Sequence, residues 1–225
     1  MAIIPGIVDS EKFGPFPEMM QALLSHTDKN VSLEAFPLAR AVFNVIDGDA
    51  DFMIPTIRGR EGRNEKRNYR FAKEKFGSVT FVLYTNDTKK ISRTTIEAAL
   101  TKNEPLPYVL EGPALSGNPL GDLLYPSNDV ALSLQKVQKG RIDGFIWAQE
   151  ESDAALRKLK LANIRREHWA DFDDTIIVAL GPRGDQADIV LSEAIRKMRA
   201  AGELEKYYKK IHRPYEDWQP ADMGW

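Results

Sequence analysis

Basic side chains crowd one short stretch of this chain, from Arg58 to Lys75. The stretch carries eight basic and three acidic residues and follows directly on the apolar run 52–57. A guanidinium is a planar fork of five donors that matches carboxylate and phosphate oxygens, and each charge-assisted hydrogen bond is worth about 1.5–3 kcal/mol. The stretch therefore offers groups that could bind an anion. A merely solvated charged surface is the alternative, and the sequence leaves both open.

Aromatic side chains could supply the other half of a site. Phe16 follows Gly14-Pro15 in the first loop, and Trp147 closes the apolar run 142–147. Open α/β sheets bind ligands beyond the carboxyl ends of their strands, where a flat ring can stack on a solute. Arg40 follows Phe36-Pro37 at a predicted helix start, so it faces either a ligand or solvent. For Phe16 and Trp147, the alternative is that the ring simply packs in the core.

Signatures of catalysis are mostly absent from the chain. His26, His168 and His212 lack the spacing of metal ligands, and no Gly-x-Ser-x-Gly, His-Glu-x-x-His or phosphate-binding glycine loop occurs. Residues 171–174 read Asp-Phe-Asp-Asp, but without a turn glycine we interpret them as a solvated crossover rather than a cation site. Zero cysteines exclude disulfides, thiolate metal sites and a cysteine nucleophile. We expect no metal and no cofactor.

Two similar units position these residues. Gly48-Asp49-Ala50-Asp51 and Gly140-Arg141-Ile142-Asp143, which start 92 positions apart, each separate a helix-like run from an apolar strand. Glycine just past a helix end can adopt the left-handed conformation that caps it, so each copy predicts helix, cap and buried strand. The repetition predicts two α/β lobes with a ligand cleft.

Periodicity along the chain predicts alternating strands and helices. We expect strands near 3–8, 31–36, 52–57, 79–84, 108–110, 142–147, 161–165 and 175–180, and helices near 18–25, 38–47, 94–101, 129–139, 151–158, 187–201 and 203–210. The closing helices have no third sheet to cover, so the first lobe is predicted to be discontinuous. We expect lobe 1 to comprise 1–85 plus 175–225 and lobe 2 to comprise 86–174, joined at strands near Thr85 and Thr175.

Composition excludes several classes of protein. The chain has 225 residues, 43% hydrophobic and 28% charged, with a formal charge of −2. It is neither disordered nor globally basic, so bulk binding to nucleic acid or membranes is not predicted. No run of 18 apolar residues and no signal segment occurs, yet Met1-Ala2 leads directly into a predicted strand, as in a chain whose leader was removed.

The order of the motifs along this chain resembles that of the family 3 extracellular solute-binding proteins, which have the type II periplasmic binding fold of ABC importers. The resemblance spans nearly the whole chain and rests on Pro37-Leu38-Ala39-Arg40, the two Gly-x-x-Asp motifs, the Arg-rich turn ending in Tyr69-Arg70-Phe71-Ala72, and the tail from Ala194-Ile195 to Tyr207-Tyr208. It implies two lobes joined by two crossing strands, which close on a small solute in the periplasm. It also implies a membrane permease as partner, no nucleic acid, and a monomer.

The resemblance implies particular site residues. Amino-acid-binding members grip the ligand carboxylate with a lobe 1 arginine, and counting from Asp51 puts Arg63 there. Phe71 comes about two residues later than usual, so Arg58 or Arg67 could serve instead. The full set of candidate ligand-binding residues is Phe16, Arg40, Thr56, Arg58, Arg63, Ser116, Trp147 and Gln149.

Two departures argue against an ordinary α-amino acid as ligand. The family's acidic partner of the ligand ammonium falls on Ala148, and although Gln149, Glu150 and Glu151 follow it, a neighbouring strand position points to the other face. The lobe 2 loop reads Gly112-Pro113-Ala114, without the usual hydroxyls, although Ser116 could rebuild an anion site.

These observations predict a periplasmic solute-binding protein that delivers a small, anionic organic solute to an ABC importer by hinged closure. One alternative is an enzyme on the same scaffold, similar to cyclohexadienyl dehydratases, for which Glu111 and Glu150 are the only candidate acids. Another is the ligand-sensing module of a receptor.

Overall fold

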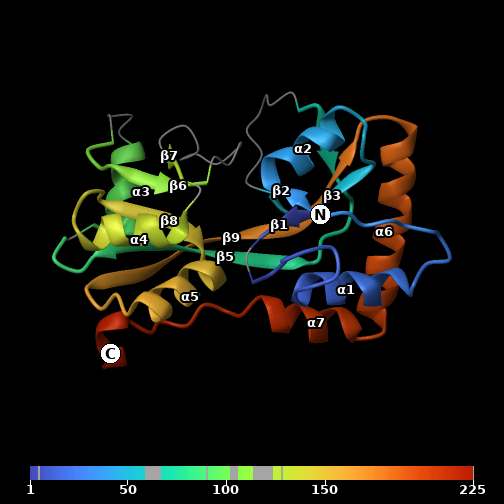
Figure 1. The fold of residues 1–225 in the computed structure, drawn as a ribbon. Coiled ribbons are helices and arrows are strands. Elements are labelled where there is room, and N and C mark those ends of the chain that lie inside the picture. Colours follow the sequence, from blue (N-terminus) through green and yellow to red (C-terminus); the bar gives the residue numbers. More distant parts are fainter. Residues whose placement is uncertain are drawn as a thin grey trace. The chain divides into compact units, whose positions relative to one another are not determined.

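The computed structural model describes residues 1–4, 6–58, 67–89, 91–101, 106–113, 124–127 and 129–224. Within them strands and helices alternate along most of the chain (Figure 1). The strands are β1 (Ala2–Ile3), β2 (Phe36–Pro37), β3 (Phe52–Arg58), β4 (Tyr69–Phe71), β5 (Gly77–Asn86), β6 (Leu110–Gly112), β7 (Tyr125–Pro126), β8 (Gly144–Ala148) and β9 (Ile164–Ala179). The helices are α1 (Pro15–Leu24), α2 (Leu38–Ile46), α3 (Arg93–Thr101), α4 (Val130–Gln138), α5 (Gln149–Leu159), α6 (Pro182–Ala200) and α7 (Glu203–Ile211), with a final 3₁₀ turn η1 (Pro220–Met223).

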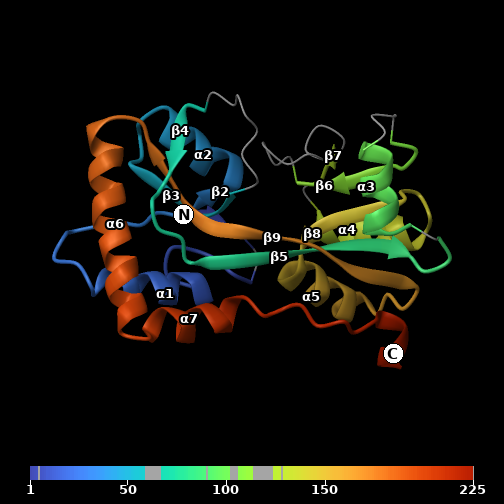
Figure 2. The same ribbon diagram turned by 180° about the vertical axis from the view of Figure 1, so that it is seen from behind.

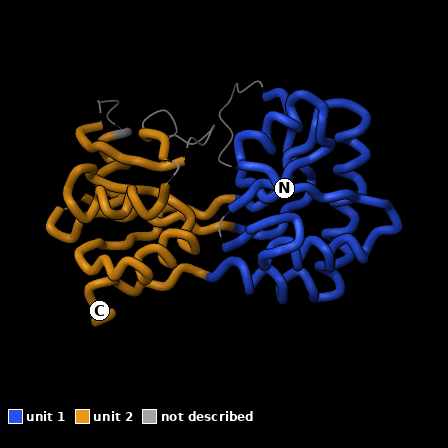
Figure 3. Tube along the Cα trace, viewed as in Figure 1, with its two compact units in different colours: residues 1–58, 63–78, 173–213 blue, residues 59–62, 79–172, 214–225 orange. Residues whose placement is uncertain are grey.

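The described chain divides into two compact units (Figure 3). Unit 1 contains Met1–Arg58, Arg63–Ser78 and Asp173–Arg213, and unit 2 contains Val79–Phe172 and Pro214–Trp225, for those residues that are described. The division falls inside β5 and inside β9, so both strands belong to both units. The sequence placed the junctions later, near Thr85 and Thr175, and assigned the last residues to the first lobe.

Unit 1 is built on the antiparallel pair of β3 and β9, which carries helices on two faces. Successive side chains of a strand point to opposite faces. Ile176 and Val178 therefore pack with α1, α6 and α7 in the larger core, whereas Ile177 and Ala179 pack with α2 in a smaller one. In both views α1 and α7 lie side by side, next to α6 (Figures 1 and 2).

Unit 2 has a core formed by β5, β8 and β9 under α4 and α5. Tyr84, Phe145, Leu134 and Leu156 are fully buried there. β8 runs antiparallel to β5 but parallel to β6, and β6 is parallel to β7. The carboxyl ends of β6 and β8 consequently lie at the same edge of this unit.

The doubled glycine motif forms the predicted helix ends. α2 ends at Ile46 and α4 at Gln138, and Gly48 and Gly140 follow with φ of 80° and 64°. A side chain at such φ would be strained, which is why glycine occupies both positions. The sequence interpretation of these two turns is confirmed.

Three sets of strand predictions were wrong. Among its described residues, the run 3–8 contributes only Ile3 to a strand, β1. The run 31–36 contributes only Phe36 to the two-residue β2, which pairs with β1, while Leu33 instead packs half-buried against the larger core of unit 1. Residues 161–165 and 175–180 are not separate strands, since β9 runs continuously through 164–179. Asp171 and Asp173 alternate with buried Phe172, so the presumed solvated crossover is a strand.

Candidate functional site

The carboxyl end of β3 brings oppositely charged side chains together. Arg58, the last residue of β3, lies directly opposite Asp173 of β9. Arg58 Nη2 donates to Asp173 Oδ2 at 2.6 Å, and Lys75 Nζ donates to the other carboxylate oxygen. The Arg58 and Asp173 side chains are 33% and 27% exposed. The pair is therefore within reach of a solute rather than sealed in the core.

Phe71 provides a ring for two guanidinium groups. The Cζ atoms of Arg58 and Arg67 lie 5.8 Å and 5.0 Å from its ring centroid, which is the range of a cation–π interaction. We call Arg58, Arg67, Phe71, Lys75 and Asp173 the basic group of unit 1. It holds three cationic side chains and one carboxylate, so its net charge is positive.

The basic group favours the ionised form of its carboxylate. Partial burial opposes ionisation of Asp173, but hydrogen bonds from Lys75 and Arg58 outweigh that effect and lower the pKa of the carboxyl below its ordinary value of 3.8. Asp173 is thus an anion at neutral pH that orients Arg58. An entering carboxylate would meet a guanidinium that is already held in place.

In unit 2, Trp147 stands near the carboxyl end of β8. Its ring stacks on Phe145, with centroids 5.5 Å apart, and its indole Nε1 donates to Glu151 Oε2 at 2.7 Å. Burial raises the pKa of Glu151, and the indole donor only partly opposes this shift. We call Phe145, Trp147 and Glu151 the aromatic group of unit 2. This group presents the half-buried ring of Trp147, whose indole nitrogen is already bonded to Glu151.

The residues around the aromatic group are largely occupied by their neighbours. Gln149 is buried, and its Nε2 lies 3.5 Å from Glu150 Oε1 in the first turn of α5. Glu111 accepts from Ser133 Oγ at 2.6 Å and from Lys136 Nζ at 2.7 Å, so each of its oxygens has a donor. Glu111 is therefore a neutralised structural carboxylate.

The candidate residues fall into different places. Thr56 lies in β3 opposite Thr175, two positions before Arg58. Phe16 is fully buried in the larger core of unit 1, where its ring meets Phe76 edge to face at 5.5 Å. Arg40 is exposed on α2 and borders a pocket of unit 1, away from the basic group. Arg63 and Ser116 lie outside the described residues.

Sequence reasoning missed Asp173, Lys75 and Glu151. Asp173 belonged to a run interpreted as a solvated crossover, and only the antiparallel register of β9 on β3 places it beside Arg58. Glu151 carried a usable signal, because it follows Trp147 by four residues at the start of a helix. Among the described residues, no cluster of three potential metal ligands occurs, and no helix is both long and apolar enough to span a membrane.

No family model and no curated protein matches the sequence. Solved structures do match the fold. A histidine kinase sensor domain with similarity to periplasmic binding proteins has a TM-score of 0.68 at 16% identity, over 89% of this chain and 88% of that chain. The GluR0 ligand-binding core from Nostoc punctiforme, in complex with L-glutamate, has a TM-score of 0.66 at 9% identity, over 95% and 97%. The arginine-, lysine-, histidine-binding protein ArtJ from Geobacillus stearothermophilus has a TM-score of 0.64 at 12% identity, over 88% and 85%.

Proposed function

We propose, on the premise that this chain has the type II periplasmic binding protein fold, that it binds a small organic solute and delivers it to the membrane permease of an ABC importer. The observation that carries the proposal is the likeness over nearly the full length of proteins such as ArtJ, which bind small molecules. The periplasm is the corresponding location. The two units would close on the solute, which solution X-ray scattering would detect as a smaller radius of gyration with ligand.

The basic group of unit 1 supports an anionic solute. Its cationic side chains outnumber its carboxylate, and Asp173 holds Arg58 at the carboxyl end of β3. Arg63, five positions further along the chain, is the first candidate to grip the solute, and Arg58 is the second. Thr56 and Trp147 are proposed contacts, while the burial of Phe16 favours its role in packing.

Substitution of the arginines tests the anionic solute. Leaving a buried anion without its partner costs about 2–5 kcal/mol, or roughly 30-fold to several thousand-fold in Kd. We expect losses of this size in Arg63→Ala and smaller losses in Arg58→Ala, measured by calorimetric titration with the solute identified by mass spectrometry of the purified protein. Arg196→Ala, a change to an exposed arginine of α6, is the matched control. If both variants stay within about threefold of the parent, the arginines are surface charges.

Free α-amino acids are not expected to be the best ligands. A zwitterion in a closed site needs both charges satisfied, because a buried ammonium without a partner loses its hydration. Ala148 lies where the family places the acidic partner, and Glu151, a half-buried carboxylate three positions later, already accepts from Trp147. Titration with the standard amino acids should give dissociation constants well above micromolar. A near-micromolar value for any of them would show that another carboxylate takes the ammonium.

Sensing is the second candidate function. The likeness to a histidine kinase sensor domain favours it, since that domain shares the fold. Two experiments separate transport from sensing. Binding of the protein to a purified permease would support transport, whereas ligand-dependent signalling from a chimaera with a kinase would support sensing. The enzyme alternative has less support, because both carboxylate oxygens of Glu111 already accept hydrogen bonds, from Ser133 and Lys136. Turnover of a cyclohexadienyl substrate by the protein would support the enzyme alternative.

A further inference from the structure

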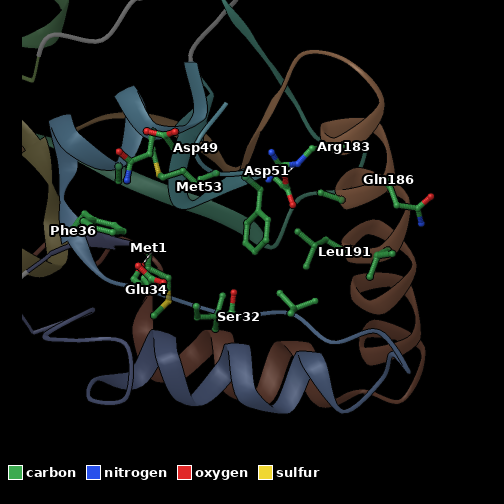
Figure 4. A pocket seen from close by; sticks show the side chains of 18 of the residues that line it. Met1, Ser32, Glu34, Phe36, Asp49, Asp51, Met53, Arg183, Gln186 and Leu191 are labelled. Atoms are coloured by element: carbon green, nitrogen blue, oxygen red, sulfur yellow. Dashed lines mark hydrogen bonds and ion pairs between the residues drawn. The ribbon is translucent and has the colours of Figure 1, made fainter. Parts of the chain in front are cut away.

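Unit 1 contains a pocket of about 710 Å³ at the opposite end of β3 from the basic group (Figure 4). Its walls come from the segment 29–34, from α2, from the start of β3 and from the first turns of α6. Asp51 and Met53 border it, whereas Arg58 ends the same strand. At about 3.3 Å per residue, some 16 Å of strand separates Met53 from Arg58. The pocket is therefore distinct from the pair of Arg58 and Asp173.

One buried side chain lacks a partner in this pocket. Asn44 on α2 lines it and is only 8% exposed, and within the described part of the chain its carboxamide makes no hydrogen bond. Its backbone oxygen accepts from Ala50 N at 2.9 Å. Buried polar side chains nearly always have a partner. The carboxamide thus presents one donor group and one acceptor to whatever fills the pocket.

The other walls combine apolar, polar and charged side chains, with Asn30, Ser32 and Gln186 among the polar ones. Phe36, Met53 and Leu191 face the space in Figure 4, and Arg183 is bonded to Asp51 at 2.7 Å across one side. The lining contains three cationic side chains, Lys29, Arg40 and Arg183, and three carboxylates, Glu34, Asp49 and Asp51. The amino group of Met1 also lines it and donates to the backbone oxygen of Glu34, while burial lowers the pKa of this amine and so disfavours its charged form. The side-chain charges therefore cancel, and the amine adds at most one positive charge. A volume of this size is typical of small-molecule sites.

We propose that this pocket is a second small-molecule site, for an uncharged ligand whose amide-like edge pairs with Asn44 and whose flat apolar body packs on Phe36 and Met53. A carboxamide is matched by a group that offers both a donor and an acceptor, as another amide does. The ligand class follows from this pairing, from the apolar side chains of Phe36 and Met53, and from side-chain charges that cancel. The site is independent of the solute proposed above.

Three probes of one shape test the proposal on the full chain: benzamide, benzoate and benzylammonium. Amide chemical shifts, followed during titration, report both the site and the Kd. We expect benzamide to saturate with a Kd on the order of millimolar, as for a ligand of about nine heavy atoms, and to shift signals of residues 41–53. Both ions should bind at least about tenfold more weakly.

Substitutions at Asn44 identify the contact. Asn44→Leu should weaken benzamide at least about tenfold, and the isosteric Asn44→Asp, which keeps the shape but loses the donor, should weaken benzamide and strengthen benzylammonium. Asn163→Leu makes the same change at an exposed position of unit 2 and should leave binding unchanged. Absence of saturable shifts around residues 41–53 would mean a hydrated pocket only. Benzamide binding that survives both Asn44 variants, or tighter binding of an ion to the parent chain, would also overturn the proposal.

Discussion

At the scale of single residues, two carboxylates titrate in opposite directions. Hydrogen bonds from Lys75 and Arg58 overcome partial burial and lower the pKa of Asp173, whereas burial raises the pKa of Glu151. A carboxyl with a lowered folded pKa stabilises the fold above its unfolded value and loses this contribution as pH falls through the folded pKa. A carboxyl with a raised pKa destabilises the fold as pH rises from its unfolded value through the folded pKa.

Neutral isosteres should therefore have opposite effects. Glu151→Gln can still accept from Trp147, so we expect higher stability at pH 7 and a smaller loss of stability between pH 4.5 and 7. Asp173→Asn should lower stability at pH 7 by at most about 1 kcal/mol, because the group is partly exposed, and the difference should shrink as pH falls from the ordinary value of 3.8 through the lowered folded pKa. Urea unfolding from pH 3 to 7 measures both, with exposed Glu11→Gln as control. A drop in stability for Glu151→Gln at pH 7 would contradict the expected sign.

At the scale of elements, one guanidinium holds the segment after α7 to β9 and α5. Arg166 of β9 is fully buried and donates to both oxygens of Asp153 on α5, at 2.8 Å and 2.7 Å. It also donates to the backbone oxygens of Glu216 and Trp218, at 3.0 Å and 2.7 Å, and lies over the Trp218 ring. Burial raises the pKa of Asp153 even beside this cation, so desolvation offsets much of the attraction.

Breaking this pair should cost more than removing it. Arg166→Met leaves a buried carboxylate uncompensated and should lower the free energy of unfolding by about 3–5 kcal/mol. The double variant with Asp153→Leu should recover part of that loss, because no charge then stays buried. Arg165→Met, at the exposed neighbouring position, is the control and should cost less than about 1 kcal/mol. If denaturant unfolding gave equal losses of free energy for Arg165→Met and Arg166→Met, the buried pair would contribute no more to stability than an exposed arginine does.

At the scale of the whole molecule, shared strands connect two cores. β9 contributes Ile164 to the core of unit 2 and Ile176 and Val178 to the larger core of unit 1. β5 begins next to Phe76 of unit 1 and contributes Val82 to unit 2. Neither core can lose its strand without exposing part of the other. The two units are therefore expected to unfold together.

Cavity-forming substitutions in each core test this coupling. Met198→Ala in unit 1 and Leu134→Ala in unit 2 remove fully buried side chains and should each cost about 2–5 kcal/mol. Each should shift a single calorimetric transition to lower temperature, with equal calorimetric and van't Hoff enthalpies. Two resolved transitions, only one of which moves in each variant, would show that the units unfold independently.

The sequence alone determined the features that depend on neighbours along the chain. Gly48 and Gly140 predicted two helix ends, and periodicity predicted most helices and the α/β class, because capping and amphipathic spacing are local. The resemblance to solute-binding proteins rested on the order of such local motifs. In the acidic run 171–174, the sequence interpretation of a crossover missed that these residues continue the strand β9.

Only the tertiary structure decided which side chains meet. Arg58 and Asp173 are 115 positions apart, and their contact depends on the register of β9 against β3, which no local pattern specifies. Arg166 lay just after a predicted strand and drew no attention, whereas in the fold Asp153 and the C-terminal segment enclose it. Asn44 looked like an ordinary polar residue of a helix until packing buried it against a pocket. Strand register and helix packing are settled by long-range burial, and that information is spread over the whole chain.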